Sequence, residues 1–192
     1  MSRRARERRG SVKVVSGELG GRRIETPPGD ATRPTAGRVR EALFNALDSM
    51  GAVEGARALD AYAGSGALGI EALSRGAAHV TFAEVDGAAR EVISDNLRAL
   101  GLTGRASVVS GDGANAVARA PEGGWDVVFL DPPYTFEDWE GVLAAVRDSL
   151  ADEGVVVVES VADVELPEGM HATRTKWYGG TVVLFAIRGA PE

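Results

Sequence analysis

The sequence predicts one α/β domain built on a mostly parallel β-sheet, and three observations support this. From residue 56 onward, short apolar segments typical of buried strands alternate with longer segments typical of helices. Near the C-terminus, two strand-like segments flank Gly179-Gly180, which is typical of an antiparallel hairpin. The chain has 192 residues, 44% of them hydrophobic and 26% charged, which is enough to bury the core of one globular domain.

The N-terminal part predicts a small extension in front of this sheet. Its first nine residues include five arginines and predict a disordered basic arm. Val12–Val15 and Arg22–Glu25 flank a glycine-rich turn and predict a β-hairpin. A helix follows, with Thr35 as its predicted N-cap. The chain is thus expected to divide into an arm (1–10), an extension (11–52) and a sheet domain (53–192).

The elements of the sheet domain are predicted in chain order from their apolar patterns. Five segments predict the parallel strands: Arg57–Ala61, Val80–Glu84, Ala106–Val109, Val127–Leu130 and Val155–Glu159. The segments between them predict four helices: Ala67–Ser74, Gly87–Leu100, Ala114–Ala118 and Trp139–Leu150. The final antiparallel pair is predicted at Thr173–Tyr178 and Thr181–Ile187.

The composition excludes several classes of site. The sequence has no cysteine, and its only histidines are His79 and His171. Disulfide scaffolds, cysteine–zinc sites and thiol nucleophiles are therefore excluded, and we expect no metal. No apolar segment approaches the length of a transmembrane helix, and none follows the N-terminal arginines as in a secretory signal. We expect a cytoplasmic protein without a membrane partner.

The net charge of -7 conceals an asymmetry along the chain. Residues 1–40 hold eleven basic and four acidic side chains, a net charge of +7. Residues 41–192 hold ten basic and 24 acidic side chains, a net charge of -14. A basic arm on an acidic body is typical of a protein that contacts a polyanion through the arm. The alternative is a solvated tail without a partner.

A glycine-rich turn follows the first predicted strand of the sheet. Gly64, Gly66 and Gly69 have the spacing G-x-G-x-x-G between a strand and a helix. Glycines here let the backbone turn tightly and approach a ligand closely. The same turn occurs in sites for NAD, FAD and S-adenosylmethionine, and it also occurs where a helix only packs closely on a strand.

The charge of Asp60 distinguishes these cofactors. A dinucleotide would place its pyrophosphate on the turn, close to this carboxylate, and the two would repel each other. S-adenosylmethionine carries an ammonium and a sulfonium instead. A carboxylate about 4 Å from such a charge attracts it by roughly 4 kcal/mol at an effective dielectric constant near 20, before desolvation is subtracted. Asp60 therefore favours S-adenosylmethionine, with a solvated or helix-capping aspartate as the alternative.

Two further acidic residues follow the next strands. Glu84 lies 18 positions after Gly66, a spacing typical of the acid that binds ribose hydroxyls. Asp86 is simply the expected N-cap of the following helix. Asp112 is placed to accept the adenine amino group, or else to cap a helix. The predicted cofactor site comprises Asp60, Gly64, Ser65, Gly66, Glu84, Val85, Asp112 and Gly113.

The fourth strand runs into Asp131-Pro132-Pro133-Tyr134, which suggests the chemistry. The exocyclic amino nitrogen of a nucleobase is a poor nucleophile because its lone pair is delocalised into the ring. Two acceptors on its N–H bonds, the Asp131 carboxylate and the Pro132 carbonyl, would help it to become pyramidal. Proline fixes φ and lacks an N–H group, which keeps that carbonyl outward. Tyr134 offers a face on which an extruded base can stack. The alternative is an ordinary turn at the end of a strand.

Taken together, these residues resemble a known family. The resemblance covers nearly the whole chain from about residue 12. One departure is Tyr62, where the family would have an apolar residue. The chain is similar to bacterial 16S rRNA guanine-N2 methyltransferases, which belong to the class I S-adenosylmethionine-dependent methyltransferases. The segments that carry the resemblance are Arg33–Asn45, Asp60–Ala77, Asp131–Tyr134 and Lys176–Gly179.

The resemblance implies the fold, the activity and the partner. It implies a Rossmann-like, seven-stranded, mostly parallel sheet that ends in an antiparallel hairpin. It implies methylation of the N2 amino group of a guanine in 16S rRNA, of the guanine-966 type. The substrate would be 16S rRNA in an assembling small ribosomal subunit, modified by a monomer. Asp131, Pro132, Pro133 and Tyr134 would hold the guanine. The expected RNA-binding residues are Arg3, Arg4, Arg22, Arg23, Arg33, Thr35 and Arg38.

Three rival functions remain open on the sequence. A DNA methyltransferase acting on adenine N6 or cytosine N4 would use the same motif, although the chain shows no separate target-recognition domain. An NAD-dependent oxidoreductase would explain the glycines but would leave Asp60 and Asp131 without a role. A nucleic-acid-binding module without catalysis would leave the amino-acceptor motif unused.

Overall fold

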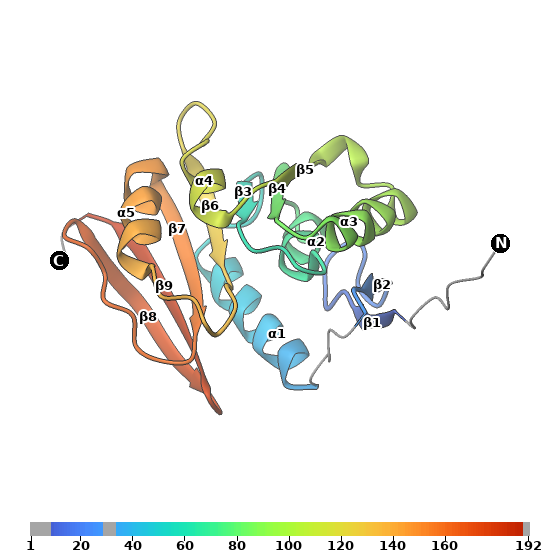
Figure 1. Cartoon of the computed structure of the whole chain (residues 1–192), viewed down its shortest axis with the longest axis horizontal. Coiled ribbons are helices and arrows are strands. Elements are labelled where there is room, and N and C mark those ends of the chain that lie inside the picture. The colour runs from blue at the N-terminus through green and yellow to red at the C-terminus, as the bar shows by residue number, and fades with distance from the viewer. Residues whose placement is uncertain (1–8, 29–33, 190–192) are drawn as a thin grey trace.

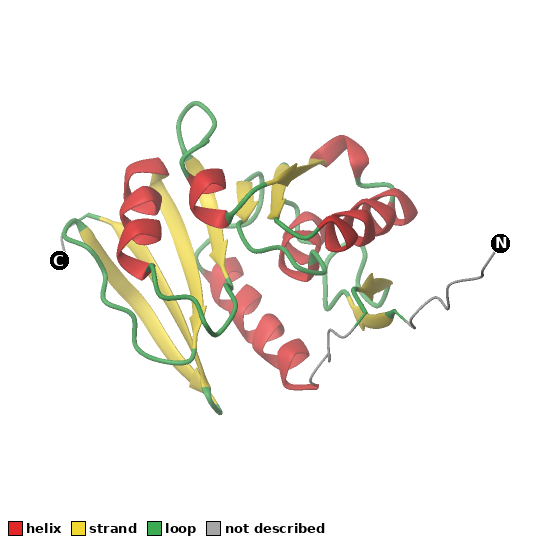
Figure 2. Ribbon diagram, in the orientation of Figure 1, coloured by secondary structure: helices red, strands yellow, loops and turns green. Residues whose placement is uncertain are grey.

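The seven-stranded sheet places the glycine turn and Asp131 at the same edge. In the computed structural model, which describes residues 9–28 and 34–189, the strand order is β5-β4-β3-β6-β7-β9-β8 (Figures 1 and 2). Strands β3 to β7 are parallel, and β9 is antiparallel to both of its neighbours. The strands are β3 (Arg57–Asp60), β4 (His79–Glu84), β5 (Ala106–Ser110), β6 (Trp125–Leu130), β7 (Leu150–Ser160), β8 (Met170–Tyr178) and β9 (Thr181–Arg188).

The strand order reverses between β3 and β6. From β3, the chain builds β4 and β5 on one side and then returns to build β6 and β7 on the other. At such a reversal the connections leave the two central strands in opposite directions, which opens a crevice at their carboxyl ends. Asp60 ends β3, and Asp131 directly follows β6, so both residues lie at the edge of the sheet where this crevice opens.

Helices cover both faces of the sheet, because alternate side chains of the central strands are apolar. On one face, Phe44 of α1 packs on Phe129 of β6 with ring centroids 5.5 Å apart. The helices α1, α2 and α3 share this face, while α4 and α5 share the other. The helices are α1 (Pro34–Ser49), α2 (Ala67–Ser74), α3 (Gly87–Leu100), α4 (Gly113–Val117) and α5 (Trp139–Ser149), with a 3-10 turn at Thr103–Arg105.

The hairpin of β1 (Gly10–Lys13) and β2 (Arg23–Thr26) is tied to α2 and α3 by buried polar groups. Glu71 of α2 is fully buried, and its carboxylate accepts the backbone N–H groups of Val15 at 2.7 Å and Ser16 at 3.0 Å. Asn96 of α3 accepts the N–H of Glu25 at 2.8 Å and donates to the Glu25 carbonyl at 2.9 Å. The extension is therefore part of the same rigid packing as the sheet.

The predicted fold class is confirmed, while several boundaries differ. Helix α1 begins at Pro34, so Thr35 lies inside the helix and is not its N-cap. Proline is favoured at the first helical position because its missing N–H would have no partner there. Strand β1 begins at Gly10, and Arg9 pairs with Glu25 at 2.7 Å. The predicted arm therefore ends before Arg9, and residues 1–8 lie outside the described part of the chain.

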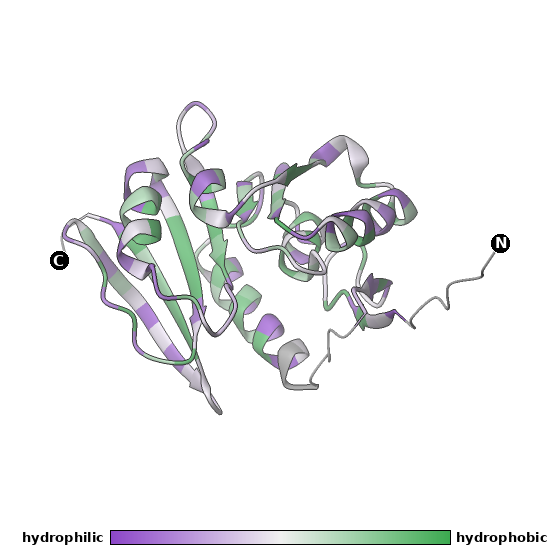
Figure 3. Cartoon of the chain, in the orientation of Figure 1, coloured by the Kyte–Doolittle hydropathy of each residue, from purple (hydrophilic) through white to green (hydrophobic). Residues whose placement is uncertain are grey.

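Apolar residues follow the layers of the fold. Figure 3 shows them along β7 and on the side of α1 that meets the sheet, whereas β8 carries several hydrophilic positions. In the part of the chain that the structure describes, no helix is both long enough and apolar enough to cross a membrane.

Candidate functional site

A cleft of about 580 Å³ lies at the carboxyl ends of β3, β4, β5 and β6. Its lining is mainly apolar, with a few carboxylates at defined positions, which is typical of small-molecule sites. The predicted site residues that line it are Gly64, Glu84, Val85, Asp112, Gly113, Asp131, Pro132 and Pro133. The predicted residues outside the lining are Asp60, Ser65, Gly66 and Tyr134.

The three glycines of the turn have different reasons to be glycine. Gly64 has φ +50°, and a Cβ there would meet no atom within 4 Å, so this residue borders open space in the cleft. Gly66 has φ +78°, which other residues rarely adopt. A Cβ on Gly69 would lie 2.3 Å from the ring of Phe82. Close packing of α2 on β4 therefore explains Gly69, and only Gly64 directly borders the cleft.

Glu84 holds this turn in place from the end of β4. Its Oε2 accepts the N–H of Gly64 at 2.8 Å, and its Oε1 accepts the N–H of Asp86 at 2.8 Å. Each carboxylate oxygen has a second acceptor site, so Glu84 can still bind hydroxyl groups of a ligand. The sequence missed the first of these tasks because the contact joins the glycine turn to the end of a strand 20 residues later.

Asp60 is buried behind the turn and does not line the cleft. Its carboxylate accepts the N–H of Gly69 at 3.0 Å, in the first turn of α2. Burial raises the pKa of Asp60 to about 7, opposed by the Gly69 hydrogen bond and reinforced by the charge of Glu84. This side chain therefore braces the start of α2. Any attraction between the Asp60 carboxylate and a cation bound in the cleft would act across the residues that line the cleft.

Asp112 caps a helix, as one of its two predicted roles requires, and it also borders the cleft. It is the N-cap of α4, where its Oδ1 accepts the N–H of Asn115 at 2.9 Å. The neighbouring Gly113 lies under the ring of Tyr62, since a Cβ there would be 2.5 Å from the ring atoms. The expected cap at Asp86 is confirmed as well, because its Oδ1 accepts the N–H of Ala89 at 2.7 Å.

The segment after β6 brings its polar groups to the mouth of the cleft. Asp131 lines the cleft and is solvent-exposed, whereas Pro132 is buried. The following turn closes through the Pro133 carbonyl, which accepts the N–H of Phe136 at 2.8 Å. Within the described residues, the Pro132 carbonyl accepts no hydrogen bond. Tyr134 is 61% exposed and does not line the cleft.

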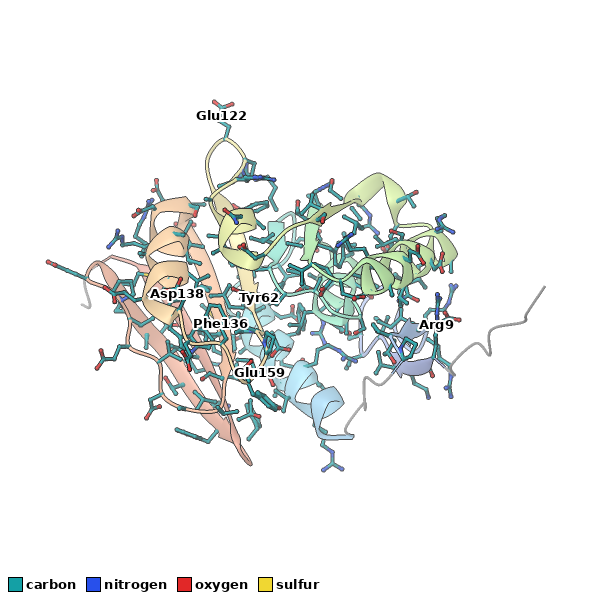
Figure 4. The ribbon with its side chains drawn as sticks, viewed as in Figure 1. Arg9, Tyr62, Glu122, Phe136, Asp138 and Glu159 are labelled. Carbon is teal, nitrogen blue, oxygen red and sulfur yellow. The ribbon has the colours of Figure 1, made fainter. Side chains whose placement is uncertain are left out.

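An aromatic wall completes the cleft. Phe136 packs against Tyr62, with ring centroids 5.5 Å apart, and against Trp139 at 5.0 Å, both edge to face. Figure 4 shows Tyr62 and Phe136 close to Asp138, the residue that caps α5. Burial raises the pKa of Tyr62 to about 12, and the charges of Asp112 and Asp138 add to this, so its hydroxyl stays protonated.

Comparison with known proteins reveals close relatives. The family model described as "Conserved hypothetical protein 95" matches residues 12–187. The chain is 38% identical over 186 residues to "Putative rRNA methyltransferase YlbH" of Bacillus subtilis, covering 93% of this chain and 100% of that protein. It is 38% identical over 162 residues to Ribosomal RNA small subunit methyltransferase D of Escherichia coli, covering 82% of this chain and 79% of the relative.

The chain belongs to the small subunit methyltransferase D family. A solved structure, "Putative methyltransferase yhhF" from Escherichia coli, superposes on it with a TM-score of 0.82 at 35% identity. That superposition covers 95% of this chain and 100% of the other. The family expected from the sequence motifs is thereby confirmed, together with the methyltransferase fold.

Of the arginines predicted to bind RNA, those that the structure describes (Arg22, Arg23 and Arg38) do not line the cleft. Arg22 and Arg23 are exposed on the hairpin side, where Arg23 donates to Ser11 Oγ at 3.1 Å. Arg38 is exposed on α1. Thr35 lies in α1, and its side chain is not described. Arg3, Arg4 and Arg33 lie outside the described residues.

Phe136 and Asp138 are cleft residues that sequence reasoning missed. Both follow Tyr134 within four residues. They could have been predicted as cleft residues if the sequence had indicated that this loop folds back over the site. The sequence pattern alone did not indicate that fold-back, because aromatic residues before a helix are also typical of ordinary core packing. Tyr62 was noticed only as a departure from the family pattern, although it packs against Phe136 and lines the cleft with it.

Proposed function

We propose that this protein transfers a methyl group from S-adenosylmethionine to the N2 amino group of a guanine in 16S rRNA. The observation that carries the proposal is that Asp131 and Pro132 line the same cleft as Gly64 and Glu84. A pair of amino-group acceptors therefore faces a site suited to a nucleoside. Both relatives from Bacillus subtilis and Escherichia coli are named as rRNA methyltransferases, which supports RNA as the substrate class.

The residues of the cleft suit S-adenosylmethionine better than a dinucleotide. Glu84, Asp112 and Asp131 are carboxylates at or beside the turn, and they would repel a pyrophosphate. They suit a ligand with hydroxyl groups, an amino group and positive charge. We propose that Glu84 binds the ribose hydroxyls, that Asp112 accepts the adenine amino group, and that Val85 covers the adenine ring. When bound, the cofactor supplies a methyl group activated by the positive sulfur.

The protein's own contribution is positioning and hydrogen bonding. The Asp131 carboxylate and the Pro132 carbonyl accept the two N–H groups of the guanine amino nitrogen, which turns its lone pair toward the cleft. Holding both reactants in line supplies most of the rate advantage. Tyr134, exposed beside this pair, stacks on the extruded base and offsets part of the cost of unstacking it. We propose that the reaction takes place on 16S rRNA during assembly of the small subunit, in the cytoplasm.

The proposal is tested by offering the purified protein RNA and DNA side by side. Unmodified 16S rRNA, small-subunit particles and a DNA duplex are each incubated with radiolabelled S-adenosylmethionine. The expected result is label in rRNA, free or in particles, and none in DNA. Label in DNA alone would support the rival DNA methyltransferase, and label in neither would contradict both.

A further inference from the structure

Exposed apolar side chains gather at one edge of the sheet. Four of the five large apolar residues that the described structure exposes lie there: Val85 after β4, Tyr134 after β6, Val161 after β7 and Trp177 near the end of β8. The cofactor cleft accounts for Val85, and the target base accounts for Tyr134. Trp177 is 56% exposed, and neither the cofactor nor the target base explains its exposure. An exposed aromatic ring can stack on the base of a single-stranded nucleic acid.

The strand register places Trp177 level with the catalytic segment. Leu130 of β6 pairs with Val158 of β7, Val158 pairs with Leu184 of β9, and Leu184 pairs with Thr175 of β8. Along the direction of the strands, Lys176 and Trp177 therefore lie level with the residues that follow Leu130. Three strand spacings of about 4.8 Å separate the two strands, which is about 14 Å. Nucleotides next to a base held at Asp131 can reach across this distance.

The same strand carries two cations without acidic partners. Arg174 and Lys176 are exposed, and within the described chain no carboxylate lies within ion-pair distance of either. β8 contains no acidic residue, although residues 41–192 carry a net charge of -14. Glu159 is in the same row as Lys176 but two strands away. The local charge of β8 is therefore opposite to that of the body around it.

Both faces of β8 are exposed over much of its length, because consecutive residues from Ala172 to Trp177 are exposed and their side chains alternate between the two faces. Arg174 and Lys176 oppose Phe185 and Val183, which belong to the core on the α1 face. Trp177 opposes Val182, which belongs to the core on the face of α4 and α5, where the cleft lies. A chain crossing this edge would therefore meet an aromatic ring on the cleft side and two cations on the other. Figure 1 shows the β8–β9 tip projecting at the lower edge of the molecule, toward which β6 also runs.

We propose that Arg174, Lys176 and Trp177, here called the β8 rim, bind single-stranded RNA beside the target guanine. Trp177 stacks on a flanking base, and Arg174 and Lys176 contact backbone phosphates. An aromatic ring next to cations is the combination that binds single strands without reading their sequence. A partner protein would need a larger apolar patch than the one exposed tryptophan of this strand. This inference rests on the proposed RNA substrate and adds where that RNA lies.

The test measures binding of a 16S rRNA fragment at several salt concentrations. Trp177→Ala should weaken binding about tenfold or more, and Trp177→Phe should restore most of it. The double variant Arg174→Gln/Lys176→Gln should lower the slope of log K against log salt by about 1.4, roughly 0.7 for each phosphate contact on a single strand. RNA should also quench the fluorescence of the wild-type protein more than that of Trp177→Phe. Arg119→Gln, which changes an exposed arginine between α4 and β6, is the matched control and should behave as wild type.

The outcomes separate this inference from the proposed function. All variants should keep wild-type melting temperatures and wild-type affinity for S-adenosylmethionine, because the β8 rim is exposed and outside the cleft. If the wild type methylates rRNA but the β8 variants bind it with unchanged affinity and unchanged salt dependence, the β8 rim does not bind RNA and the proposed function stands. If the variants lose RNA affinity while the wild type methylates no rRNA, the proposed function is wrong. A change confined to the oligomeric state would overturn the inference in favour of contact with a second copy.

Discussion

Asp60 is a residue whose pKa depends strongly on the fold. In an unfolded chain an aspartate has a pKa of about 3.9. Burial raises that of Asp60 to about 7 in the folded protein, so between these values the folded state binds more protons than the unfolded state. The free energy of unfolding must then fall as pH rises from about 4 to about 7, and it becomes independent of this group above that range.

Replacing Asp60 by asparagine should remove this pH dependence. The amide oxygen of Asp60→Asn can still accept the N–H of Gly69, so the brace on α2 is kept. We expect the wild type to lose stability relative to the variant by up to about 1.4 kcal/mol per pH unit within the window. Urea unfolding at intervals from pH 4 to 8 measures both slopes. Parallel profiles would mean that Asp60 remains ionised throughout.

Substitutions of Asp131 test the proposed chemistry of methyl transfer. Asp131→Ala removes one of the two proposed acceptors and should lower kcat by about 100-fold or more. The affinity for S-adenosylmethionine, measured by calorimetry, should stay within about twofold, because the contacts proposed for the cofactor lie on other strands. Asp131→Asn keeps one acceptor oxygen and should retain more activity than alanine. Loss of cofactor binding together with turnover would contradict the role assigned to this side chain.

Single residues were predictable from sequence where their task depends on neighbours in the chain. The N-caps Asp86 and Asp112 are examples, because a cap bonds an N–H three residues later. Asp60 was expected to face the cofactor, but whether a residue at a strand end points into the cleft or behind the turn depends on sheet packing. Glu84 was expected to bind ribose only, although it also holds the turn.

Among the elements, the buried strands and the helices were well predicted, and the exposed strand segments were not. The bounds of α2 and α3 agree with the predicted ones, because their apolar stripes are regular. β7 begins at Leu150, but its first residues are largely exposed and show no alternation. β8 is exposed along most of its length, so its start at Met170 had no apolar signal. A strand outside the core is defined by its pairing partner, which a local pattern does not contain.

The docking of the hairpin on α2 can be tested with a matched pair of glycines. Gly17 and Gly21 have similar φ values, +78° and +83°, so alanine brings a similar backbone strain at both. A Cβ on Gly17 would lie 1.9 Å from the Ser74 carbonyl oxygen, whereas a Cβ on Gly21 would meet nothing within 4 Å. Gly21→Ala should cost about 1–2 kcal/mol. Gly17→Ala should cost about 1–3 kcal/mol more because of the clash. Equal losses in thermal unfolding would mean that the hairpin does not press on α2.

For the molecule as a whole, charge separates an acidic catalytic body from a basic N-terminal part. An acidic body repels RNA at long range, so binding must depend on local groups of cations. Deleting residues 1–8, which include four arginines, should weaken binding of 16S rRNA and reduce its salt dependence. Arg9 is kept in this variant because it pairs with Glu25 and Asp95. An unchanged salt slope in filter-binding assays would assign these arginines no part in RNA binding.

The central claim is that the cleft brings a guanine amino nitrogen to an activated methyl group. It is tested most directly by the identity of the modified nucleoside. 16S rRNA from a strain that lacks this enzyme is incubated with the protein and labelled S-adenosylmethionine, digested to nucleosides and analysed by mass spectrometry. We expect the label in N2-methylguanosine, and we expect no label with Asp131→Ala. Label in a methylated adenosine, a methylated cytidine or a ribose 2′-oxygen would contradict the central claim.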